Sequence, residues 1–116
     1  MTSRTAEIKL TVDLDADKVA TRIQWQAAEA PGGVATCQSM MLSLWDSEKQ
    51  VTAAIDLWTR DMTIEDMNAF FYQVLHKMAD TYLRATQNAS VAESIHEFGN
   101  KFGDTLGVRC GELKRK

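Results

Sequence analysis

One stretch, residues 42–62, constrains the fold of this chain more than any other. It holds two near-copies of one pattern, Leu-Ser-Leu-Trp-Asp and Ile-Asp-Leu-Trp-Thr, on either side of a polar connector. Short apolar runs on both sides of turn residues are typical of a β-hairpin. The spacing of the apolar residues becomes helical from Thr63 onward. The stretch therefore predicts both a hairpin and the point where the helical half of the chain begins.

The first strand of this hairpin, residues 37–45, is ambiguous, because its apolar residues also fit helical spacing. Its short length and the similar sequence of residues 55–58 favour a strand. A five-residue connector at 46–50 would place Trp45 opposite Val51 and leave both faces of the hairpin apolar. One of these faces would carry Met40, Leu42, Leu44 and Trp58.

Both faces of such a hairpin need a cover, because an antiparallel sheet covered on one side normally shows polar residues on the other. Helices can cover one face. A second copy of the chain is the leading interpretation for the other face, ahead of a different protein or the Pro-Gly-Gly loop at 28–35. The candidate interface comprises Met40, Leu42, Leu44, Trp45 and Trp58.

The first part of the chain predicts a second hairpin. Apolar and polar residues alternate over 7–14 and again over 19–27, which is the pattern of half-buried strands. Asp13, Asp15 and Asp17 superficially open a calcium loop, but Lys18 and Gln24 stand where such a loop needs glycine and glutamate. A turn is the favoured interpretation.

Two helices are predicted in the second half. Thr63-Ile-Glu-Asp66 and Ser90-Val-Ala-Glu93 resemble capping boxes, and Gly107 is a plausible helix end. Gly99 and Gly103 lie on one flank of the second helix, which suggests either a close approach to a neighbour or, almost equally, glycines tolerated on the surface. The apolar stripe of the first helix comprises Met67, Phe70, Phe71, Val74, Leu75, Met78 and Tyr82.

Together these elements predict an α+β fold: a four-stranded antiparallel sheet made of two hairpins, with two C-terminal helices packed on one face. The length suits a single domain over 1–116, with an ordered core at 5–107 and a basic tail at 108–116. Trp25 and Phe71 are expected in the core, where truncation to alanine costs about 3–5 kcal/mol.

The charge distribution bears on the partners. Residues 109–116 carry +3 of a net charge of −3, so residues 1–108 carry −6. An acidic body disfavours nucleic acid and anionic membranes as partners. No window approaches the roughly 20 apolar residues of a membrane span, and the start lacks the apolar run of a signal peptide. A cytoplasmic protein with reduced Cys37 and Cys110 is expected.

One carboxylate, Asp56, is a candidate for a functional role. Asp56 lies between two apolar residues, Arg60 has the parity to approach it, and Asp61 precedes the helix. We interpret Asp56, Arg60 and Asp61 as a buried polar network that holds the strand-to-helix corner, and a catalytic role is disfavoured.

No other chemistry emerges from the sequence. His76 and His96 are predicted on the solvent sides of their helices, and Glu93-x-x-His96 lacks the second copy that a carboxylate-bridged metal site needs. The sequence contains no phosphate-binding glycine loop, nucleophile elbow or paired-cysteine zinc motif. We therefore expect no catalytic residues, no metal, no cofactor and no enzymatic activity.

Several long motifs resemble the GldC family of small proteins from gliding bacteria. They are Leu42-Ser-Leu-Trp-Asp46, Ile55-Asp-Leu-Trp-Thr-Arg-Asp-Met62, Met67-x-x-Phe70-Phe71-x-Gln73 and Met78-Ala-Asp-Thr-Tyr82-x-Arg84-Ala-Thr86. The resemblance spans residues 8–106 and implies a cytoplasmic accessory role in gliding motility, with no enzymatic activity and no catalytic residues. The tail lies outside it.

The leading functional hypothesis is a homodimeric protein-interaction module with Trp45 or Trp58 as anchors and a further protein partner. One alternative is a single-stranded nucleic-acid platform, for which the predicted sheet and its connector offer only Lys9, Arg22, Lys49 and Arg60. Another is a small-ligand domain or enzyme with Asp56 at the base of a pocket.

Overall fold

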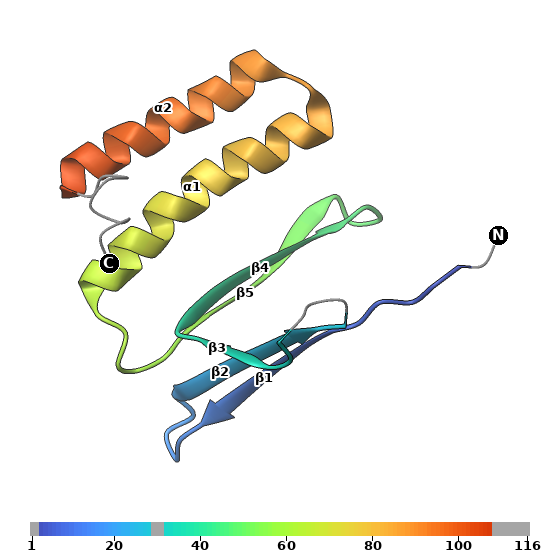
Figure 1. Cartoon of the computed structure of the whole chain (residues 1–116), viewed down its shortest axis with the longest axis vertical. Helices are drawn as coiled ribbons and strands as arrows, with labels where there is room; N and C mark the ends of the chain where they lie inside the picture. Colours follow the sequence, from blue (N-terminus) through green and yellow to red (C-terminus); the bar gives the residue numbers. More distant parts are fainter. Residues whose placement is uncertain (1–2, 29–31, 108–116) are drawn as a thin grey trace. The chain divides into compact units, whose positions relative to one another are not determined.

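A computed structural model describes residues 3–28 and 32–107 of the chain (Figure 1). The chain divides into two compact units, one ending at Met62 and the other beginning at Thr63. The first unit is a β unit and the second a helical unit, and each is described by itself. The predicted basic tail lies outside the described residues, and the packing of helices on a sheet stays a prediction.

The N-terminal hairpin is confirmed. Strands β1 (Ile8–Leu14) and β2 (Ala20–Ala27) pair antiparallel, with Leu10 opposite Trp25 and Val12 opposite Ile23. The expected turn between them is built on Asp15, whose carboxylate accepts the backbone N–H of Asp17 at 2.8 Å and of Val19 at 3.1 Å. The bond from Val19 is the main reason that the pKa of Asp15 is lowered.

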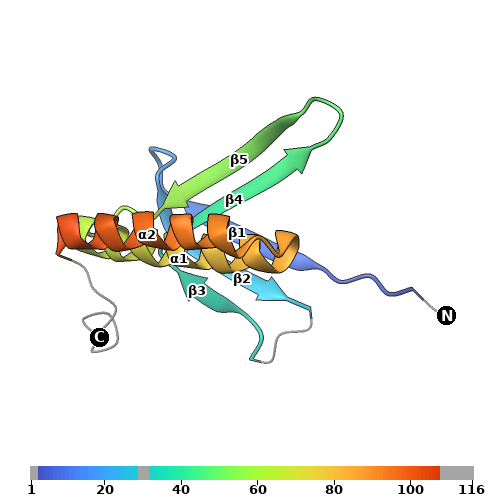
Figure 2. The ribbon, with the colours of Figure 1, turned by 90° about the horizontal axis from the view of Figure 1, so that it is seen from above.

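The segment 37–45 is extended rather than helical, but Gln38 divides it between two strands, and the expected single four-stranded sheet was wrong. β3 (Ala35–Cys37) joins β2, and after Gln38 the chain enters β4 (Ser39–Asp46), which pairs with β5 (Val51–Trp58). The result is a three-stranded sheet, β1-β2-β3, and a separate two-stranded sheet, β4-β5. Figure 2 shows the β4–β5 hairpin diverging from the three-stranded sheet.

The split has a local cause at the base of the hairpin. The backbone N–H of Thr59 donates to Gln38 O at 2.8 Å, and that of Arg60 donates to Ala20 O at 3.0 Å. These two bonds tie the end of β5 to both the β3–β4 junction and the start of β2. Within residues 3–28 and 32–107, the rest of β4 and β5 then pair only with each other.

The register of the β4–β5 hairpin differs by one residue from the predicted one. Trp45 lies opposite Thr52, not Val51, because Asp46 completes the ladder by pairing with Val51. The Asp46 carboxylate closes the four-residue turn by accepting the backbone N–H of Glu48 at 3.0 Å and of Lys49 at 3.1 Å. A one-residue shift reverses the facing of the second strand relative to the first. Trp58 therefore lies on the face of Trp45, not on the face of Leu44.

The buried part of the β unit is small. Ile23 is completely buried, and Ala20 and Thr59 are nearly so. Trp25, which was expected in the core, remains 39% exposed. Its position near the open end of the sheet, opposite Leu10 and Ala35, explains why burial is incomplete.

The helical unit is an antiparallel pair, α1 (Ile64–Thr86) and α2 (Ala89–Leu106) (Figure 1). Thr63 caps α1 as predicted, its hydroxyl accepting the backbone N–H of Asp66 at 3.0 Å. The second cap is Asn88, not Ser90, because Gln87 adopts a positive φ of 62° and brings Asn88 into position two residues earlier. Gly107 ends α2 with a φ of 75°, as expected.

The helices contact each other through small residues. Ala79 of α1 and Ala92, Gly99 and Gly103 of α2 are all buried, which confirms the predicted close approach of the two glycines. Phe71, in contrast, is 41% exposed and was wrongly expected in the core. Among the residues that the structure describes, neither helix combines the length and apolar character needed to cross a membrane.

Candidate functional site

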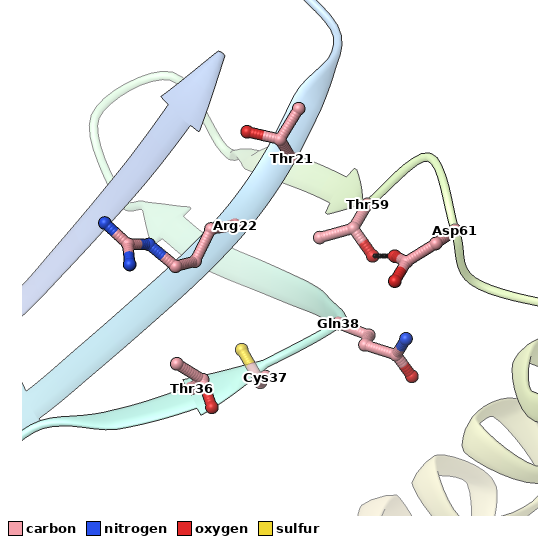
Figure 3. Close-up of a pocket in the computed structure, with 7 residues that line it drawn as sticks. All are labelled: Thr21, Arg22, Thr36, Cys37, Gln38, Thr59 and Asp61. Atoms are coloured by element: carbon pink, nitrogen blue, oxygen red, sulfur yellow. Dashed lines mark hydrogen bonds between the residues drawn. The ribbon is translucent and has the colours of Figure 1, made fainter. Parts of the chain in front are cut away.

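The β unit contains a cleft of about 400 Å³ where its two sheets meet (Figure 3). Four chain segments supply the lining: β2, β3, the Gln38 junction and the turn after β5. The lining is rich in hydroxyl, amide and charged groups: Thr21, Arg22, Thr36, Cys37, Gln38, Thr59 and Asp61. The chain leaves one sheet at Gln38, and this break in the ladder opens the cleft.

The turn after β5 forms a rigid wall of the cleft. The Thr59 side chain is buried, and its hydroxyl donates a hydrogen bond of 2.6 Å to the Asp61 carboxylate. The backbone of Thr59 also accepts the N–H of Met62 at 3.1 Å. Short, charge-assisted bonds of this kind fix side-chain geometry. Thr59 and Asp61 therefore hold the corner at which β5 ends.

The predicted network of Asp56, Arg60 and Asp61 does not form. Asp56 is exposed, and Arg60 pairs with the Asp15 carboxylate instead. Arg60 and Asp15 are distant in sequence, so alternation along one strand could not reveal their pairing. Asp61 is exposed and accepts a hydrogen bond from Thr59, which was not part of the predicted network. Asp56 is not among the residues that line the cleft.

Charge at the cleft is largely compensated. Arg22 Nε donates to the Asp13 carboxylate at 2.8 Å, and both side chains are substantially exposed. Exposed pairs of this type contribute about 0–1 kcal/mol to stability. Arg22 thus reaches the cleft with its charge already paired.

Cys37 is the nucleophilic group in the cleft wall, and its thiol lies among the lining side chains in Figure 3. Burial raises the pKa of Cys37, while a backbone hydrogen bond from Ser39 acts weakly in the opposite direction. Because thiolate is the reactive form, a raised pKa makes the thiol slow to react at neutral pH. Cys37 therefore has the character of an inert wall residue.

This assignment predicts slow alkylation of Cys37. In a Cys110→Ser background, where Cys37 is the single cysteine, we expect folded protein to react with iodoacetamide at neutral pH at least about fivefold more slowly than urea-unfolded protein. Mass spectrometry over time measures both rates. Equal rates, or a faster rate in the folded state, would contradict the assignment.

The predicted interface residues fall on opposite faces of the β4–β5 hairpin. We call one the leucine face, because Met40, Leu42 and Leu44 lie there with Ile55 and Leu57. The other is the tryptophan face. It carries Met41, Trp45 and Trp58 together with the small or polar residues Ser39, Ser43, Thr52, Ala54 and Asp56.

Both faces carry exposed apolar side chains, and the size of these side chains distinguishes the faces. On the tryptophan face, Trp45 is 62% exposed and Trp58 is 57% exposed. On the leucine face, Met40, Leu42 and Leu57 are half-buried, although Leu44 and Ile55 are exposed. The largest accessible apolar side chains of the hairpin are therefore the two tryptophans.

The two histidines do not lie on the solvent sides of their helices, where sequence periodicity placed them. His76 and His96 meet between the helices, with their Nδ1 atoms 2.6 Å apart, their ring centroids 4.9 Å apart and an angle of 26° between the ring planes. His96 Nε2 also lies 3.2 Å from an Asp80 carboxylate oxygen. The expectation of solvent-facing histidines was wrong, because the close approach at Gly99 turns this flank of the helix into the interface. The described residues hold no group of three or more potential metal ligands.

Comparison with known proteins gives the chain its context. Residues 20–108 match the family model described as gliding motility-associated protein GldC-like. The chain belongs to this family. The match runs from β2 through α2 and includes the whole cleft lining, both hairpin faces and the histidine pair. It confirms the resemblance seen in the sequence motifs. Searches of curated proteins and of solved structures found no match for this GldC-like chain.

Proposed function

We propose that this GldC-like chain is a non-enzymatic cytoplasmic accessory protein of gliding motility that works as a protein-interaction module, and that its first partner is a second copy of itself. The observation that carries the proposal is the tryptophan face, with two tryptophans that are each more than half exposed. Tryptophan is the side chain most enriched among residues that dominate binding energy at interfaces.

The architecture of the hairpin supports a need for a partner. Among the described residues, β4 and β5 pair only with each other, and a two-stranded sheet with exposed faces is marginally stable in water. Aromatic side chains are enriched at protein interfaces. Burial of the tryptophan face would therefore stabilise the hairpin and the complex together.

The placement of the tryptophans favours self-association. Trp45 pairs with Thr52 near the turn, whereas Trp58 pairs with Ser39 at the base of the hairpin. In a two-fold symmetric dimer each contact occurs twice with the partners exchanged. Two antiparallel hairpins stacked face to face would bring Trp45 of one copy beside Trp58 of the other.

Charge is compatible with this arrangement. The chain carries a net charge of −3, but Asp56 is the single charged residue of the tryptophan face. Electrostatic repulsion between two copies would then arise mainly from outside the interface. The nucleic-acid alternative is less favoured, because two of its four candidate cations, Arg22 and Arg60, are paired with aspartates.

Sedimentation velocity tests the proposal. We expect the wild type to form a dimer that dissociates on dilution, and Trp45→Ala to weaken the dimer at least tenfold, the effect of losing about 1.4 kcal/mol. The matched control is Leu44→Ala, because Leu44 is its chain neighbour, is 56% exposed and lies on the leucine face. This variant is expected to change dimer affinity less than about threefold.

Two results would overturn the proposal. One is a wild type that remains monomeric up to about 100 µM, a concentration at which even weak specific dimers are populated. The other is a dimer that is weakened by Leu44→Ala and not by Trp45→Ala. That outcome would assign the interface to the leucine face.

A further inference from the structure

We propose that His76 and His96 form a pH-sensitive lock between α1 and α2, closed when both rings are neutral and released when either gains a proton. The lock lies wholly within the helical unit and does not depend on the proposed dimer. It rests on two contacts that share the His96 ring. His96 Nε2 contacts Asp80 Oδ1, and His96 Nδ1 contacts His76 Nδ1.

The contacts determine which nitrogens carry protons. His96 Nε2 lies 3.2 Å from the Asp80 carboxylate, which can only accept, so His96 Nε2 carries the hydrogen. A neutral His96 then has a bare Nδ1. That atom is 2.6 Å from His76 Nδ1, so His76 Nδ1 must be the donor. The chain of bonds runs from His76 through His96 to Asp80.

The remaining nitrogen, His76 Nε2, supports the same assignment. It is buried and has no hydrogen-bond partner. In the assigned tautomer Nε2 is a bare lone pair, whereas the alternative tautomer would bury an N–H without an acceptor, at a cost of about 1–3 kcal/mol. The neutral pair therefore satisfies each of its N–H groups.

Gly99 provides the space for this arrangement. A Cβ atom at position 99 would lie 2.9 Å from His76 Nε2 and 3.0 Å from His76 Cε1. The Tyr72 ring packs edge-on against His76, with centroids 4.9 Å apart. The His76 ring thus lies close to both Gly99 and Tyr72.

An added proton has no acceptable position. On His96 Nδ1 it would set two N–H groups against each other across 2.6 Å, unless His76 changed tautomer and buried an unpaired Nε2–H. On His76 Nε2 it would be buried without an acceptor among the described residues. A second proton would place two positively charged rings edge to edge, with their Nδ1 atoms 2.6 Å apart. Each route weakens the packing of α1 on α2.

The surrounding charges set the direction of the pH response. Burial, followed by the proximity of His96, lowers the pKa of His76, and the Asp80 carboxylate opposes them. The other charged side chains within four residues of the pair are exposed: Lys77 on α1, and Glu93 and Glu97 on α2. A lowered histidine pKa means that the unfolded chain binds more protons. The stabilisation is complete above pH 6.5 and is lost as the pH falls below it.

Nuclear magnetic resonance of ring-¹⁵N-labelled histidine in the full chain tests the lock directly, since the chain has two histidines. At about pH 7.5 we expect His76 as the Nδ1–H tautomer and His96 as the Nε2–H tautomer, with His76 titrating below its ordinary range. Two rings that titrate independently near their ordinary value, or both Nε2–H tautomers, would overturn the proposal.

A measurement of stability at two pH values is the second test of the lock. Urea unfolding followed by circular dichroism is expected to show the folded-to-unfolded ratio of the wild type falling at least about fivefold between about pH 7.5 and 5.5. The control is a His76→Phe, His96→Gln variant, which keeps a ring in the Gly99 space and has no histidine. Its ratio should change less than about twofold over the same range. Equal pH responses in both proteins would also overturn the lock.

Discussion

Replacing Ile23 by alanine should lower the free energy of unfolding of the β unit by about 2–5 kcal/mol. Ile23 is completely buried at the centre of the three-stranded sheet, opposite Val12 on one side and Cys37 on the other. The cost combines lost transfer energy with the cavity left behind. Urea unfolding followed by tryptophan fluorescence isolates this unit, because all three tryptophans precede Met62.

The matched control for this prediction is Ile8→Ala. Ile8 lies on the same sheet, in β1, but is 74% exposed. Its truncation removes the same atoms and creates little cavity, so we expect a cost below about 1 kcal/mol. Similar losses for the two variants would contradict the placement of the core at Ile23.

The second large effect is expected at Gly99. Gly99→Ala gains about 1 kcal/mol of helix propensity, so an exposed site would be stabilised. Here the new Cβ would lie 2.9 Å from His76 Nε2, and the ring would have to leave its contacts with His96 and Tyr72 to make room. We expect a net destabilisation of about 1–3 kcal/mol, the usual cost of overpacking. Urea unfolding followed by circular dichroism reports on the helices.

A double-mutant cycle identifies the cause. If the alanine clashes with His76, the cost of Gly99→Ala should largely vanish, or become a gain, in a His76→Ala background. We expect a coupling between the two positions of about 1–3 kcal/mol, as for residues in direct contact. Additive effects would show that Gly99 is required for another reason.

Much of the local structure could be predicted from the residues. The alternation in β1 and β2 and the Thr63 cap were correctly read, because each depends on neighbours a few positions apart. The close approach at Gly99 and Gly103 could also be predicted. Glycine lowers helix propensity, so two glycines inside a helix suggest close packing against a neighbour. The Trp-containing hairpin at 42–62 was placed correctly to within one residue of register.

The errors lie where one hydrogen bond decides between close alternatives. Whether Asp46 belongs to the ladder or to the turn determines which face Trp58 occupies, and the composition of the segment permits both. The two-sheet arrangement depends on bonds from Thr59 to Gln38 and from Arg60 to Ala20, which join positions far apart in the chain. Apolar patterning does not distinguish these pairings from a continuous sheet.

The candidate site residues also divide into those that the sequence identified and those that it could not assign. The sequence alone marked Trp45 and Trp58 as unusual and led to the family to which the chain belongs. It could not assign the histidines, because helical periodicity places a residue on a flank and does not say which flank meets the neighbouring helix.

By itself, then, the sequence determined four of the five strands, the two helices with both of their starts to within two residues, and the family, since these depend on local backbone preferences and motifs. The short strand β3 was not predicted. Tertiary structure alone decided the division into two sheets, the partner of Arg60 and the meeting of His76 with His96. These features join residues 20 or more positions apart. Their stability comes from packing and hydrogen bonds that exist only once the chain has folded.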